Sequence, residues 1–168
     1  MEFSNIEVLQ LPDISKLTFK RIHRDYLKVV SLTIITVFSV LFLVVFLLET
    51  NVEEIRAFPY IKYSYFFLMF LFLILLIAFG IGFSRRKYIL RDKDVTYKSG
   101  VLFKKTTTVP FSRIQHVELD EAPISRIFNL ASISVFTAGD SSDDLVIKGI
   151  KKEEALKIKE FINQQING

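Results

Sequence analysis

The chain has 168 residues, of which 51% are hydrophobic and 24% are charged, and its formal net charge is +4 at pH 7. This length leaves room for a membrane part and one small domain. The sequence contains no cysteine, which excludes a disulfide framework and a thiolate metal site. The apolar excess is concentrated in two blocks, as expected when lipid forms part of the solvent around a chain.

Residues 1–28 are mixed and moderately polar, and they end in a basic group from Lys20 to Arg24. A secretory signal would have a shorter apolar run followed by a small-residue cleavage site. Here the first apolar run begins only at Val29 and continues to Leu48, with no such site after it. We therefore predict a cytoplasmic N-terminal segment over residues 1–28 and a retained transmembrane helix over residues 29–48.

Four hydroxyl side chains interrupt this first apolar run, and they allow two interpretations. A serine or threonine hydroxyl in a helix can donate a hydrogen bond to a carbonyl one turn earlier. Small polar residues can also face a second helix and allow close approach. The sequence leaves both interpretations open. The four residues are Ser31, Thr33, Thr36 and Ser39.

A second transmembrane helix is predicted over residues 63–83, because no charged residue lies between Lys62 and Arg85. About 20 apolar residues suffice to cross a bilayer core. Basic residues gather before the first helix and after the second, whereas the connector 49–62 is richer in acids. The positive-inside rule then places both termini in the cytoplasm and the connector outside, in a multi-pass protein of the inner (plasma) membrane. Neither apolar span carries an ionisable side chain, which argues against an ion or proton pathway.

From residue 84 onward the hydrophobic period changes from that of helices to that of strands. Short runs rich in β-branched and aromatic residues alternate with turn residues, which predicts about six strands. Residues 151–167 carry an apolar stripe at helical spacing. We therefore expect residues 84–168 to form a cytoplasmic α+β domain, a β-roll closed by a C-terminal helix. The stripe consists of Ala155, Ile158, Phe161, Ile162 and Ile166, and Leu156 lies off it.

A short helix is predicted between two of these strands, over Pro123–Phe128. Proline is favoured at the first helical position, because its missing N–H would be unpaired there. Asn129 follows, and asparagine is the next-best residue after glycine for the left-handed conformation that ends a helix. We therefore expect a positive φ at Asn129 in this helix-terminating turn.

Three stretches of the sequence are distinctive in their order and spacing: Val109-Pro110-Phe111-Ser112-Arg113-Ile114-Gln115-His116-Val117, Pro123-Ile124-Ser125-Arg126-Ile127-Phe128-Asn129-Leu130-Ala131 and Thr137-Ala138-Gly139. With the order of the predicted elements, they resemble bacterial membrane proteins with a pleckstrin-homology-like (PH-like) domain, of the YdbS type. Asn129 departs from the family pattern, in which glycine is usual. The resemblance implies two bent antiparallel sheets capped by a helix, a membrane-anchored adaptor role, and no catalytic residues.

The residues themselves offer little for catalysis. His23 and His116 are the only histidines, and His116 has Glu118 two positions along the same predicted strand. No third ligand follows at metal spacing, and no serine has an evident base beside it. We therefore predict no catalytic residue, no metal and no cofactor. Basic residues are interleaved with acids and lack an aromatic platform, which argues against nucleic acid as a partner.

A set of basic residues near the membrane exit gives candidate contacts for anionic lipid headgroups. Topology and solubility explain the first three of them equally well, because juxtamembrane lysine and arginine favour the cytoplasmic side. The turn Arg91–Asp94, taken as the first strand-to-strand loop, is short and half acidic, which argues against a specific headgroup pocket. The candidate contacts are Arg85, Arg86, Lys87, Lys98, Lys104 and Lys105.

The sequence thus predicts a non-enzymatic, membrane-anchored interaction module. Its PH-like domain would bind a protein partner, either a second copy in a homo-oligomer or another PH-like-domain membrane protein. The expected interface is an open strand edge or the groove beside residues 151–167. The alternative is a subunit of a transport or lipid-handling membrane complex, with anionic headgroup contacts.

Overall fold

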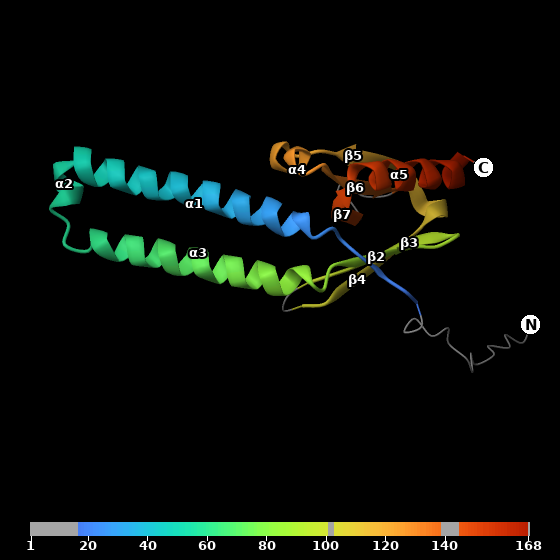
Figure 1. Ribbon diagram of the computed structural model, residues 1–168, viewed down its shortest axis with the longest axis horizontal. Coiled ribbons are helices and arrows are strands. Elements are labelled where there is room, and N and C mark those ends of the chain that lie inside the picture. The colour runs from blue at the N-terminus through green and yellow to red at the C-terminus, as the bar shows by residue number, and fades with distance from the viewer. Residues whose placement is uncertain (1–16, 101–102, 139–144, 168) are drawn as a thin grey trace, which may run out of the picture.

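The computed structural model describes residues 17–100, 103–138 and 145–167. Two long helices lie side by side at one end, and a small domain of two sheets and two helices lies at the other (Figure 1). The long helices are α1 (Asp25–Asn51) and α3 (Ile61–Phe83), joined through the single-turn helix α2 (Glu53–Arg56).

Helices α1 and α3 are long and apolar enough to cross a membrane. Only 11% and 6% of their most apolar stretches are buried within the chain, so most of these side chains face outward, as in lipid-facing helices. Each helix begins before the apolar run that predicted it. Helix α1 also continues past Leu48, where Thr50 and Asn51 bond back to carbonyl oxygens of the preceding turn.

The first interpretation of the hydroxyl residues in α1 is confirmed for two of the four. Thr33 and Thr36 donate to the carbonyl oxygens of Val29 and Leu32, at 2.8 and 2.9 Å. Ser39 instead lines a small cavity between the two long helices, close to the edge-to-face contact of Phe38 with Phe72.

The domain contains two antiparallel sheets. The first sheet has the order β1-β2-β3-β4, with strands Lys20–Arg21, Lys87–Leu90, Asp94–Ser99 and Lys105–Pro110. The second has the order β5-β6-β7, with strands Ile114–Asp120, Leu130–Thr137 and Leu145–Lys151. A 3-10 turn, Phe111–Arg113, links the sheets. Helix α4 (Pro123–Ile127) connects β5 to β6, and α5 (Lys152–Asn167) follows β7.

This arrangement confirms the predicted α+β class, with six strands after the helical hairpin, a short helix and a C-terminal helix. The structure adds β1, a strand of two residues from the N-terminal segment that pairs with β2. The turn Arg91–Asp94 therefore joins β2 to β3, and taking it as the first strand connection was wrong. The connection between the first two strands is the transmembrane hairpin itself.

The core lies between the two sheets and under α5. The predicted stripe of α5 faces it: Ala155, Ile158 and Ile162 are buried, and the other two members pack against the core. Leu156 is 49% exposed, as its position off the stripe requires. The largest fully buried side chains are Leu130, Ile133, Ile147, Ile150, Ile162, Val95 and Val135.

Helix α1 is packed onto the domain rather than merely tethered to it. Tyr26 and Val29 belong to the same buried core as the sheets. Gly149 on β7 has a φ of 81° and lies so close to the Tyr26 ring that a Cβ there would approach the ring carbon Cγ to 2.6 Å. The His23 N–H also donates to the Gly149 carbonyl at 2.8 Å. The first turn of the membrane helix is therefore part of the domain.

Candidate functional site

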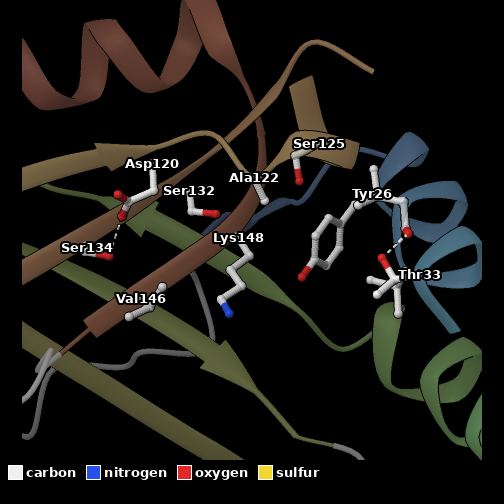
Figure 2. Close-up of a pocket in the computed structure, with 11 residues that line it drawn as sticks. Tyr26, Thr33, Asp120, Ala122, Ser125, Ser132, Ser134, Val146 and Lys148 are labelled. Carbon is white, nitrogen blue, oxygen red and sulfur yellow. Dashed lines mark hydrogen bonds between the residues drawn. The ribbon is translucent and has the colours of Figure 1, made fainter. Parts of the chain in front are cut away.

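Three of the cavities in the described part of the chain border the junction between the helices and the domain, and the third, of about 560 Å³, lies between residues 21–25 and the end of α3. The first, the junction cleft, has a volume of about 450 Å³. It lies between the start of α1 and the outer face of the β5-β6-β7 sheet (Figure 2). Its lining includes Tyr26, Val29, Thr33, Asp120, Ser132, Ser134 and Lys148.

The junction cleft has an apolar wall and a polar floor. Val29 and Val30 of α1 contribute the wall. On the floor, the Ser134 hydroxyl donates to an Asp120 carboxylate oxygen at 3.2 Å, and the Lys148 side chain lies between that pair and Tyr26 (Figure 2). In the described part of the chain, Lys148 forms no ion pair. The cleft can therefore accept a molecule with one polar end and one apolar end.

The second cavity, here called the basic cavity, has a volume of about 510 Å³ and lies between the end of α3 and the β3–β4 hairpin. It begins directly after Phe83, where α3 ends. The structure brings five of the six candidate headgroup contacts together there. These are Arg85, Lys87, Lys98, Lys104 and Lys105, and the remaining lining residues are Ser84, Ser99, Gly100 and Thr106.

Arg86, the sixth candidate, lies elsewhere. Its guanidinium carbon is 5.1 Å from the centre of the Phe79 ring and 5.9 Å from that of Tyr26. The turn that ends α3, in which the Arg85 and Arg86 N–H groups donate to the Gly82 and Phe83 carbonyls, separates Arg86 from the lining of the basic cavity. Its cation–π contacts help to join the two membrane helices at their domain ends.

The helix-terminating turn at Asn129 is as predicted. Asn129 has a φ of 55°, and its N–H donates to the Arg126 carbonyl at 3.0 Å. Its own carbonyl accepts the N–H of Lys152 at 3.1 Å, so this turn also positions the start of α5. Asn129 therefore has a structural role that both short-range and long-range hydrogen bonds support.

Each histidine side chain lies near one carboxylate, and that of His116 also stacks on the neighbouring strand. The His116 ring stacks on Phe136 with centroids 4.3 Å apart, and its Nε2 lies 3.6 Å from Glu118. His23 Nδ1 lies 3.2 Å from an Asp25 carboxylate oxygen. Among the described residues, no group of three histidine, aspartate or glutamate side chains is placed to hold a metal ion.

One polar cluster was not identified from the sequence. The buried Tyr88 hydroxyl on β2 donates to the Glu154 carboxylate on α5 at 2.6 Å, and Lys20 on β1 approaches the same carboxylate at 2.6 Å. Burial, together with this hydrogen bond, raises the pKa of Tyr88. Burial alone would raise the pKa of Glu154, but Lys20 and Tyr88 outweigh it and lower that pKa. Only the fold brings these three distant positions together.

Comparison with known proteins gives two matches. A family described as "Bacterial PH domain" matches residues 30–166. UPF0699 transmembrane protein YdbS of Bacillus subtilis (strain 168) is 26% identical over 78 residues. That alignment covers 46% of this chain and 47% of the relative, so the match spans about half the length of each. No solved structure matches.

Proposed function

Because the chain belongs to the bacterial PH-domain family, we propose that it is a membrane-anchored interaction module whose domain binds a second PH-like-domain membrane protein, a copy of itself included. Its two apolar helices and its transmembrane relative make it a membrane protein. We further propose that both termini lie in the cytoplasm, which places the domain on the cytoplasmic face of the membrane. The open edge of strand β4 supports the binding role.

Strand β4 pairs with β3 along its whole length, and in the described part of the chain no strand pairs with its other side. Thr106 and Thr108 are exposed there. Natural proteins protect open edges with lysine and proline. Here Lys105 and Pro110 occupy the two ends of β4, and the middle of the strand remains accessible.

One hydrogen bond shows which backbone groups of β4 point toward β3 and which point away from it. The Phe111 N–H donates to the Lys93 carbonyl at 2.9 Å. Directly opposite residues of two antiparallel strands alternate between hydrogen-bonded and non-hydrogen-bonded pairs. Counting along the register from the hydrogen-bonded pair of Lys93 with Phe111, the Tyr97–Thr107 pair is also hydrogen-bonded. The backbone N–H and C=O groups of Thr106 and Thr108 therefore point away from β3. They are available to an added strand.

The proposal is tested by a substitution that removes one outward donor. Thr106→Pro deletes an N–H that the β3–β4 ladder does not use, and proline is tolerated at such edge positions. Thr106→Ala is the matched control, since it changes the side chain and keeps the N–H. Because the chain has no native cysteine, Thr108→Cys can report association through a short bis-maleimide cross-link in native membranes.

We expect a cross-linked adduct that survives Thr106→Ala and is lost with Thr106→Pro. The adduct's mass identifies either a second copy or another membrane protein. The melting temperature of each variant confirms that its domain is folded. A folded Thr106→Pro variant that cross-links as well as the parent contradicts binding at this edge.

The junction cleft favours a second candidate, a lipid-handling role. Its apolar wall on α1 and its polar floor suit an amphipathic molecule. A photoactivatable phospholipid in the same membrane should label the chain near Val30, and Ser132→Phe, which fills the cleft, should reduce that labelling. Unchanged labelling contradicts this role and leaves the β4 proposal untouched.

A further inference from the structure

We propose that the basic cavity binds the phosphate groups of anionic phospholipids in the bilayer that the chain spans, with Phe103 inserted in the lipid interface beside it. This inference does not require a partner at β4. It rests on three observations: a row of like charges, the lack of acidic partners, and the position of the cavity.

Three cations face one another across three neighbouring strands. Arg21 on β1 is opposite Lys87 on β2, and Lys87 is opposite Lys98 on β3. Directly opposite residues share one face of a sheet with their Cβ atoms about 5 Å apart, and like charges in that arrangement are destabilising. Lys104 and Lys105 add two further charges from the hairpin. A bound anion would offset this repulsion.

Several other basic side chains of the domain have acidic partners. Lys20 pairs with Glu154 at 2.6 Å, and Lys152 pairs with Glu121 at 2.8 Å. The lysines of the basic cavity differ. Within the described ranges, none of the four lies within 4.0 Å of a carboxylate oxygen, and no aspartate or glutamate lines the cavity. Lys98 Nζ lies 3.8 Å from the centre of the Phe19 ring, a contact that leaves its charge in place. The lysines therefore form a cluster of positive charge without a neighbouring carboxylate.

The position of the cavity favours lipid over a soluble anion. Its first lining residue, Ser84, follows the last residue of α3 directly, at the level where a membrane helix meets the headgroups. Phe103, in the β3–β4 connection beside Lys104, is 88% exposed. Phenylalanine is among the side chains that membrane-surface segments bury at the boundary between headgroups and acyl chains, next to lysine and arginine. A phosphate bound by the lysines would hold this ring against the bilayer.

The full chain in phospholipid vesicles provides the test. Because the sequence has no tryptophan, Phe103→Trp introduces a single tryptophan. With brominated phosphatidylglycerol in the bilayer, we expect its fluorescence to be quenched and its emission to shift to shorter wavelength. Leu156→Trp on α5 is the control at another exposed apolar position, and we expect it to remain unquenched. Equal quenching at both positions overturns the insertion of Phe103.

A charge-matched pair of variants tests the cavity. Lys98→Gln with Lys104→Gln removes two cavity lysines, whereas Lys157→Gln with Lys159→Gln removes the same charge from α5. Each juxtamembrane lysine contributes roughly fivefold to anionic lipid binding, so the cavity variant should need about 25-fold more phosphatidylglycerol for half-maximal quenching. Equal dependence in both variants shows an effect of overall charge and overturns the cavity proposal.

Inorganic pyrophosphate in the aqueous phase distinguishes the two sources of phosphate. We expect it to leave the quenching unchanged when lipid phosphate is in excess. If low concentrations of pyrophosphate abolish the quenching, the basic cavity is a site for soluble phosphates, and the assignment to lipid is overturned.

Discussion

Gly149→Ala tests whether the membrane helix α1 is packed directly onto the domain. Gly149 has a φ of 81°, and an added Cβ would lie 2.6, 2.8 and 3.0 Å from three carbon atoms of Tyr26. Tyr26 is only 8% exposed, and Arg86 and Phe79 pack against its ring. The ring therefore has little room to move away from the new methyl group.

Two costs add at this position. The left-handed conformation costs a residue with a side chain about 1–2 kcal/mol. Overpacking a filled core costs about 1–3 kcal/mol. We therefore expect Gly149→Ala to lower the free energy of unfolding by about 2–5 kcal/mol, a large part of the roughly 5–15 kcal/mol typical of a domain. For a domain of this size, the melting temperature should fall by at least about 8 °C.

Thermal unfolding of the full chain in detergent, followed by circular dichroism, measures this loss. Gly80→Ala in α3 is the control, because no atom lies within 4 Å of its added Cβ. Combining Gly149→Ala with Tyr26→Ala removes the contacts with the two ring carbons but keeps the contact with Tyr26 Cβ, so it relieves part of the overpacking cost. The double-mutant cycle should then give a coupling of about 0.5–3 kcal/mol. A Gly149→Ala variant as stable as the parent, or additive effects in the cycle, would refute direct packing of α1 on β7.

Three further predictions follow from single positions. Asn129→Val should lower the free energy of unfolding by about 1–2 kcal/mol, because valine fits a φ of 55° poorly, whereas Asn129→Gly should be neutral or mildly stabilising in the same melts. The pKa of Glu154 is lowered from its ordinary value of 4.5, so its carboxylate stabilises the fold above that pH, and this contribution is lost as pH falls through the folded-state pKa. Glu154→Gln should therefore weaken the dependence of melting temperature on pH below about 4.5; an unchanged dependence contradicts the assignment. In intact cells, a membrane-impermeant thiol reagent should label Ala57→Cys and not Ser112→Cys, and the reverse pattern contradicts the proposed topology.

Features with a local signal were predictable from the sequence. The second long helix follows from its uncharged apolar run, and the positive φ of Asn129 follows from the residues around one turn. The position of Arg86 was not predictable in this way, because it depends on the turn between α3 and β2 and on the packing of its guanidinium against Tyr26 and Phe79.

Features that depend on distant pairing were not predictable. Strand β1 has only two residues, which are too few to show a hydrophobic pattern. It forms because Lys20 and Arg21 pair with β2, which follows the transmembrane hairpin in the sequence. The contact of Tyr88 with Glu154 requires both the sheet and the placement of α5. The basic cavity is intermediate: its residues were selected from the sequence, but the register of β2 with β3 is what places Lys87 opposite Lys98.

The insertion of the helical hairpin between β1 and β2 means that anchor and domain cannot be treated as separate parts. Strand β1 enters α1 and strand β2 leaves α3, so the two membrane helices continue into two paired strands of one sheet. Tyr26 and Val29 then bury the first turn of α1 in the core of the domain. Exchanging the helices for another hairpin must therefore retain α1 up to this turn, or the domain loses part of its core. For the same reason, a shift of α1 against α3 in the membrane would strain the β1–β2 pairing, since packed cores deform little.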